Sequence, residues 1–98
     1  MQAFMVLPFK GNILHFYAKL GQVRKFREAF DDGLPFFRDS NGDTPLTVAY
    51  MNLNWGVVNQ ILRLITEHPS RCKPSEKDIA FMLSHKTALA TQAMDYLI

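Results

Sequence analysis

A turn that leads directly into a helix start lies near the middle of the chain and constrains the fold more than any other stretch. Asn41 and Gly42 form a dipeptide typical of turns, because both residues tolerate a positive φ with little steric penalty. Thr44 follows as a predicted N-cap, whose hydroxyl can accept a hydrogen bond from a backbone N–H one turn into the helix. Pro45 then takes the first helical position, where its missing N–H would be unpaired anyway. We therefore expect a helix that starts at Pro45.

A similar helix start occurs earlier in the chain. Leu14 stands in it where Leu46 stands in the later one, and Asn12 takes the cap position that Thr44 occupies later. Apolar positions at helical spacing follow both starts. Recurrence of a helical unit at a period between about 20 and 50 residues is the signature of a stacked repeat protein. The sequence therefore predicts at least two equivalent units.

The second of these units resembles the ankyrin repeat. Residues 41–49 are similar to the family's G-x-T-P-L-H-x-A signature, and His15 in the first unit matches the histidine of that signature. Gly21-Gln22-Val23 resembles the turn between the two helices of a repeat, and Gly33 stands where the second helix ends. The distance from Leu14 to Leu46 is one residue short of the family's period of about 33 residues. The resemblance implies an all-α fold, a short ankyrin-repeat-like solenoid of stacked helix-turn-helix units.

The resemblance also divides the chain of 98 residues, which we expect to form a single domain. The predicted units are repeat one at about 10–38, repeat two at about 39–67 and a diverged terminal repeat at about 75–98. Ser75, with Asp78 three positions later, is close to a capping box and starts the third unit. Ile79 follows Leu46 at the family's period of about 33 residues. We expect Leu14, Leu46 and Ile79 to be equivalent buried residues on three successive first helices.

Charge and composition exclude several classes of partner. The chain carries 11 basic and 9 acidic residues, a net charge of +2, and has no run of five like charges. We therefore expect no nucleic acid as a partner. No stretch approaches the length of about 18 apolar residues that a membrane span needs, so no direct membrane insertion is expected. Cys72 is the only cysteine, and the chain's start lacks the basic region of a secretory signal. These features predict a cytoplasmic location.

No group of residues in the sequence suggests catalysis. We find no nucleophile elbow, no glycine-rich phosphate loop and no metalloprotease helix. His68, Cys72 and His85 are the only grouping that suggests a metal, but their spacing matches no standard zinc site and a fourth ligand is missing. We therefore expect no enzyme activity, no metal and no cofactor.

The function expected from the resemblance is binding to another protein, because a solenoid offers an extended surface for that purpose. Members of the family make contacts through the finger, which is the hairpin-like turn before a first helix, and through the exposed end of each first helix. The finger here is residues 39–43. Carried over to this sequence, the predicted partner-binding residues are Lys19, Leu20, Ser40, Asn41, Asp43, Met51 and Asn52. Leu20 and Met51 carry the strongest hint, because apolar side chains on a wet surface are typical of an interface.

The resemblance assigns structural roles to two further residues. His15 is expected to bond neighbouring loop backbone, and Asp39 to tie down the finger turn. Phe37 occupies a position that is usually polar in the family. It is either an exposed aromatic anchor or a residue that fills the space left by the shorter loop.

A second function remains open from the sequence. The chain could be a structural or packing segment of a larger multidomain protein or assembly, such as a channel or a multi-subunit complex, without a partner site of its own. An apolar end face that needs a neighbour favours this alternative, and a stable monomer favours the binding module. The apolar cluster within Met1 to Pro8 is expected to cap the first unit, to be the tail of a further one, or to be a disordered leader.

Overall fold

The computed structural model describes residues 12–97, which form six α-helices and no strand. The helices are α1 (Ile13–Leu20), α2 (Val23–Asp31), α3 (Pro45–Met51), α4 (Trp55–Glu67), α5 (Glu76–Ser84) and α6 (Ala88–Met94). The predicted all-α fold is therefore confirmed for this part of the chain. The prediction for Met1 to Pro8 lies outside the described residues. None of the six helices is long and apolar enough to cross a lipid bilayer.

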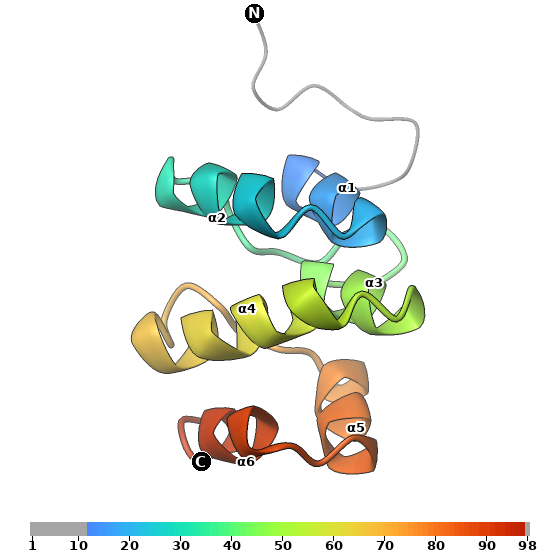
Figure 1. The fold of residues 1–98 in the computed structure, drawn as a ribbon, viewed down its shortest axis with the longest axis vertical. Helices are drawn as coiled ribbons and strands as arrows, with labels where there is room; N and C mark the ends of the chain where they lie inside the picture. Colours follow the sequence, from blue (N-terminus) through green and yellow to red (C-terminus); the bar gives the residue numbers. More distant parts are fainter. Residues whose placement is uncertain (1–11, 98) are drawn as a thin grey trace, which may run out of the picture.

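The helices form three pairs that follow one another along the long axis of the molecule (Figure 1). Within each pair a short turn joins the two helices, and between pairs α1 packs on α3, α2 on α4, α3 on α5 and α4 on α6. One helix departs from this regularity. In Figure 1, α5 runs along the long axis, whereas the other helices lie across it.

The core lies between the helix pairs. Leu14 on α1 and Leu46 on α3 are fully buried, as the sequence predicts. The prediction for Ile79 is wrong, because this residue is only partly buried and the fully buried side chains of α5 are Asp78 and Met82.

The cause of that error is visible in the helix starts. The N-caps of the three first helices are Asn12, Thr44 and Ser75. The interval between the second and third caps is therefore shorter than the interval between the first and second, whereas the family's period requires a longer one. Counting from these caps, Lys77 and not Ile79 occupies the position of Leu46. The connection before α5 differs because α4 has 13 residues where α2 has 9, and the loop that follows α4 is shorter.

The first two turns within the pairs share a left-handed residue directly before the N-cap of the second helix, but the residue type differs. Gly21 ends α1 with φ 73°, a left-handed conformation that glycine adopts without steric penalty. Leu53 lies directly before the N-cap of α4, as Gly21 lies before that of α2, and its φ is 57°. It is the one non-glycine residue with a positive φ in the described chain. Its side chain is 65% exposed, so burial of the leucine does not compensate for the strained backbone.

We predict that Leu53→Gly stabilises the protein. Relief of the left-handed conformation stabilises the folded state by about 1–2 kcal/mol. The greater freedom of glycine in the unfolded chain offsets about 0.4–1 kcal/mol of this gain. The free energy of unfolding should therefore rise by roughly 0.5–1 kcal/mol in urea denaturation. Leu83→Gly is the control, because Leu83 is also exposed but lies within α5, where glycine lowers stability by about 1 kcal/mol. Equal losses for both variants would contradict the strain at Leu53.

The loop between α4 and α5 is anchored to the first helix pair. The guanidinium of Arg71 lies 3.7 Å from the centre of the Phe30 ring, and its Nη2 donates to the Phe30 carbonyl oxygen over 2.7 Å. Cys72 beside it is fully buried. Burial raises the pKa of the Cys72 thiol from 9.0 to about 12, and the charge of Arg71 acts in the opposite, weaker sense. This thiol is therefore a packing residue.

We predict that Cys72 resists thiol reagents while the protein is folded. The thiolate is the reactive form, and a pKa of about 12 leaves almost none of it near neutral pH. Labelling with an aromatic disulfide should be slow in buffer and complete within minutes in denaturant. Because the folded pKa lies above the unfolded one, the thiol's contribution to stability is present below pH 9 and is lost as the pH rises toward 12. Rapid labelling of the folded protein would show that the loop opens.

Candidate functional site

The finger is held by the side chain of Asp39. Its Oδ1 accepts hydrogen bonds from the backbone N–H groups of Asn41, over 2.9 Å, and of Asp43, over 3.0 Å. Gly42 completes the turn with φ 82°, and its N–H donates to the Asp39 carbonyl oxygen over 2.9 Å. The expected role of Asp39 is confirmed. The turn leaves Ser40 and Asn41 exposed at the tip.

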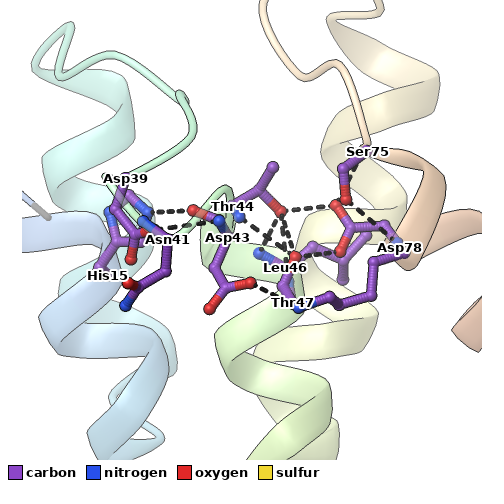
Figure 2. A network of polar contacts seen from close by, with 10 residues as sticks. His15, Asp39, Asn41, Asp43, Thr44, Leu46, Thr47, Ser75 and Asp78 are labelled. Atoms are coloured by element: carbon purple, nitrogen blue, oxygen red, sulfur yellow. Dashed lines mark hydrogen bonds and ion pairs between the residues drawn. The ribbon is translucent and has the colours of Figure 1, made fainter. Parts of the chain in front are cut away.

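Asp43 is a correction to the predicted surface, because the residue is only 8% exposed. Its carboxylate lies 2.9 Å from the ammonium of Lys77 on α5, and its backbone carbonyl accepts from His15 Nε2 over 2.9 Å (Figure 2). A backbone carbonyl can only accept, so Nε2 of His15 carries a proton. The expected role of His15 is thereby confirmed. Asp43 joins neighbouring pairs and does not contribute to the outer surface.

The carboxylate of Asp78 is the centre of a buried polar network that joins α3 to α5 (Figure 2). The hydroxyl of Thr44 donates to its Oδ2 over 2.6 Å, and the hydroxyl of Thr47 donates to its Oδ1. The N–H of Ser75 also donates to Oδ2, over 2.9 Å. Asp78 is fully buried, so each of these donors replaces water that the carboxylate has lost.

The network also satisfies the helix starts around it. Thr44 Oγ1 accepts from the N–H groups of Leu46 and Thr47 within α3, and the hydroxyl of Thr47 accepts from the N–H of Thr44. Each hydroxyl thus donates across the interface and accepts within its own helix. Asp78 lies in the first turn of α5 and against the first turn of α3, where the positive ends of both helix dipoles favour a negative charge.

Asp78 also acts on Tyr50, which lies one helical turn after Thr47 on α3. Burial, with a smaller contribution from the charge of Asp78, raises the pKa of Tyr50 to about 12. Its ring stacks on Phe81 of α5 with the ring centres 4.9 Å apart. The phenol is therefore neutral over the physiological pH range and extends the contact between α3 and α5.

The third position of each first helix carries a polar side chain that closes a capping box. His15, Thr47 and Asp78 are the third residues of α1, α3 and α5, and each closes a capping box with its own N-cap. His15 reaches the carbonyl before α3, and Thr47 reaches the carboxylate of α5. Sequence reasoning identified the capping box at Ser75 but missed that Asp78 binds α3. A polar residue at this position in all three units was the signal that could have revealed the network.

We predict that Thr44→Val costs more stability than loss of an ordinary helix cap. A lost N-cap costs about 1 kcal/mol, and loss of a donor to the buried carboxylate of Asp78 adds about 1–3 kcal/mol. Thr87→Val is the matched control, because the Thr87 hydroxyl caps α6 by accepting from the Ala90 N–H within its own helix pair. Thermal or urea unfolding measures both. Similar losses in the two variants would show that the bond from Thr44 to Asp78 contributes little.

The other predicted partner-binding residues lie in two groups at opposite ends of α3. Ser40 and Asn41 precede its start. Lys19, Leu20, Met51 and Asn52 lie at the ends of α1 and α3, and all four are exposed. The side-chain amide of Asn54 donates to the carbonyl oxygens of Ala18, over 2.8 Å, and Lys19, over 2.9 Å, which holds these two helix ends together. Since α3 has seven residues, about 10 Å separates the two groups.

Leu53 and Trp55 lie next to the second group, and sequence reasoning did not place them in the site. Trp55 is 44% exposed, and its ring meets the rings of Tyr50 and His85 edge to face, with centres 6.0 and 5.3 Å apart. Packing on two sides fixes the indole while its remaining surface faces solvent. The absence of a glycine at position 53 is the sequence signal for the unusual turn that displays Leu53 and Trp55.

Residues 12–97 bring no three metal-ligating side chains together. His68 lies against the ring of Phe30, whereas His85 lies against Trp55 near the other end of α4. The site is therefore a surface of exposed side chains on a scaffold of buried polar contacts. Comparison of the chain with family models, with curated proteins and with solved structures gave no match.

Proposed function

We propose that the chain is a protein-interaction module built from ankyrin-like helix pairs, which binds a partner through its finger tip and the exposed ends of its first helices. The recurrence of capping boxes at Asn12, Thr44 and Ser75, and the left-handed residue before the second helix in each of the first two pairs, support the kinship with the ankyrin repeat. The module acts in the cytoplasm and has no catalytic role.

The observation that carries this proposal is the exposure of apolar side chains on a fixed support. Leu20 is 52% exposed and Met51 is 50% exposed, at the ends of two helices that Asn54 ties together. Because the backbone at these helix ends is already fixed, no loop has to be ordered on binding, which lowers the entropic cost of burying the two side chains. Lys19 and Asn52 border the two apolar residues and supply polar contacts at the rim.

A second function, a packing segment within a larger assembly, is favoured by the last helix pair. Tyr96 and Leu97 are exposed just after α6, so this end of the described chain presents apolar surface. Sedimentation of the purified chain separates the two functions. A monomer at micromolar concentration favours the binding module, and association that Tyr96→Ser abolishes favours the packing segment.

We predict that Met51→Glu leaves the fold intact and weakens partner capture. Met51 is half exposed, so the free energy of unfolding should change by no more than about 0.5 kcal/mol, while binding should weaken by more than about 1 kcal/mol if Met51 is an anchor. The measurement is affinity capture from cell extract with quantitative mass spectrometry, followed by titration of the captured protein.

Phe37→Glu is the matched control for that experiment. Phe37 is also exposed but lies in the loop before the finger, against His15. A partner retained by this variant and lost by Met51→Glu supports binding at the helix ends. Unfolding of Met51→Glu, or equal retention of every captured protein by both variants, would contradict the proposal.

A further inference from the structure

The exposed apolar side chains of the molecule gather along the three turns that join the helices of each pair. We name this surface the turn edge and define it as residues 19–24, 51–56 and 83–88. Nine large hydrophobic side chains are exposed in the described chain, and six of them lie on the turn edge: Leu20, Val23, Met51, Leu53, Trp55 and Leu83. The turns contain only a minority of the residues, so this distribution separates the turn edge from the rest of the surface.

The three turns follow one another along the stack and are joined by contacts. Asn54 of the second turn donates to the carbonyl oxygens of Ala18 and Lys19 at the first. Gly56 packs against Val23 so closely that a Cβ there would lie 2.9 Å from the valine Cγ2. The ring of Trp55 meets that of His85 in the third turn at 5.3 Å. These contacts make the turn edge one surface that spans all three pairs.

Its charge has one sign. Lys19, Arg24 and Lys86 are exposed on it, and none of the chain's 9 acidic residues falls within its three stretches. The ion pairs of the described residues involve Arg27 and Lys77 and lie elsewhere. The cations of the turn edge thus have no carboxylate partner within residues 12–97.

We propose that the turn edge binds an acidic segment of another protein, one that carries a few large apolar side chains. This inference rests on the proposed function and adds the chemistry of the partner. Carboxylates of the segment pair with the three cations, which steers the encounter and sets its specificity. Apolar side chains of the segment cover Leu53, Trp55 and their neighbours, which supplies most of the affinity.

Charge also decides against two other occupants. A second copy joined edge to edge would bring like charges together, because each turn edge carries Lys19, Arg24 and Lys86. Residues 1–11 of the same chain contain apolar side chains but no acidic residue, and they include Lys10. Neither offers a carboxylate to the turn edge.

The backbone of Leu53 agrees with a binding role. The first turn uses Gly21 at the equivalent place, and the second accepts a strained leucine whose side chain faces solvent. Strained backbone of this kind clusters at functional sites. It displays the leucine beside Trp55, and the contacts of Trp55 with Tyr50 and His85 fix the neighbouring aromatic surface.

The test uses the full chain and two synthetic peptides, each long enough for about four helical turns. One peptide carries leucines at helical spacing with glutamates between them, and the control peptide replaces every glutamate with lysine. Trp55 is the only tryptophan, so its fluorescence reports contact at the turn edge directly. Anisotropy of a labelled peptide gives the dissociation constant. We expect the acidic peptide to bind and shift the Trp55 emission, with affinity falling as salt rises, and the basic peptide to do neither.

Variants locate the binding. Lys19→Glu and Lys86→Glu should each weaken the acidic peptide by about fivefold or more, whereas Lys73→Glu, an exposed charge in the loop after α4, should not. Leu53→Gly should weaken binding although the fold is expected to be more stable, so a loss of affinity there cannot be ascribed to unfolding. Tyr96→Ser is the apolar control outside the turn edge.

Each remaining outcome overturns the inference in a distinguishable way. Binding of both peptides with the same shift of Trp55 emission would leave the interaction function standing and refute the acidic chemistry. No shift with either peptide at millimolar concentration would refute the turn edge, and the separate capture experiment with Met51→Glu then decides the proposed function. Self-association that buries Trp55, seen by sedimentation and emission together, would replace the partner with a second copy.

Discussion

Helix α5 depends on the carboxylate of Asp78 for its place against α3. Apart from this residue, α5 buries only Met82 completely. Three donors converge on the carboxylate, and two of them come from the start of α3. The contact between α3 and α5 is therefore directional, whereas the contact between α1 and α3 buries Leu14 and Leu46 and is mostly apolar. A buried charge held by several donors tolerates few other geometries, which makes the network a determinant of orientation as much as of stability.

Local signals in the sequence were sufficient for the first two pairs and insufficient for the third. Thr44 and Pro45 define a helix start by their own chemistry, and the recurrence of the pattern at Asn12 requires only counting. Ile79 was misplaced because the count assumed a constant period, whereas the length of α4 and of the loop after it changed the spacing. Such a change depends on packing between distant segments, which no local pattern records.

The same distinction holds for the surface. The exposure of Leu20 and Met51 followed from their places at helix ends, but the burial of Asp43 depends on Lys77 of the next pair, far along the chain. The structure separates the two ends of each first helix. The start of each first helix is buried in polar contacts that fix the neighbouring pairs. The end of each first helix lies on the turn edge, which is exposed, cationic and apolar. Because the buried polar contacts fix the stack at one side, the turn edge at the other side needs no rearrangement of the helices to bind a ligand.

The direction of α5 has a consequence for the symmetry of the molecule. The first two pairs lie parallel to one another, with their helices across the long axis (Figure 1). Because α5 lies along the stacking axis instead of across it, that relation is not repeated, and the surface beyond α6 differs from the surface beyond α4. A further helix pair packed beyond α6 would therefore meet a surface of different shape, so the regular stacking of the first two pairs ends at the rotated helix.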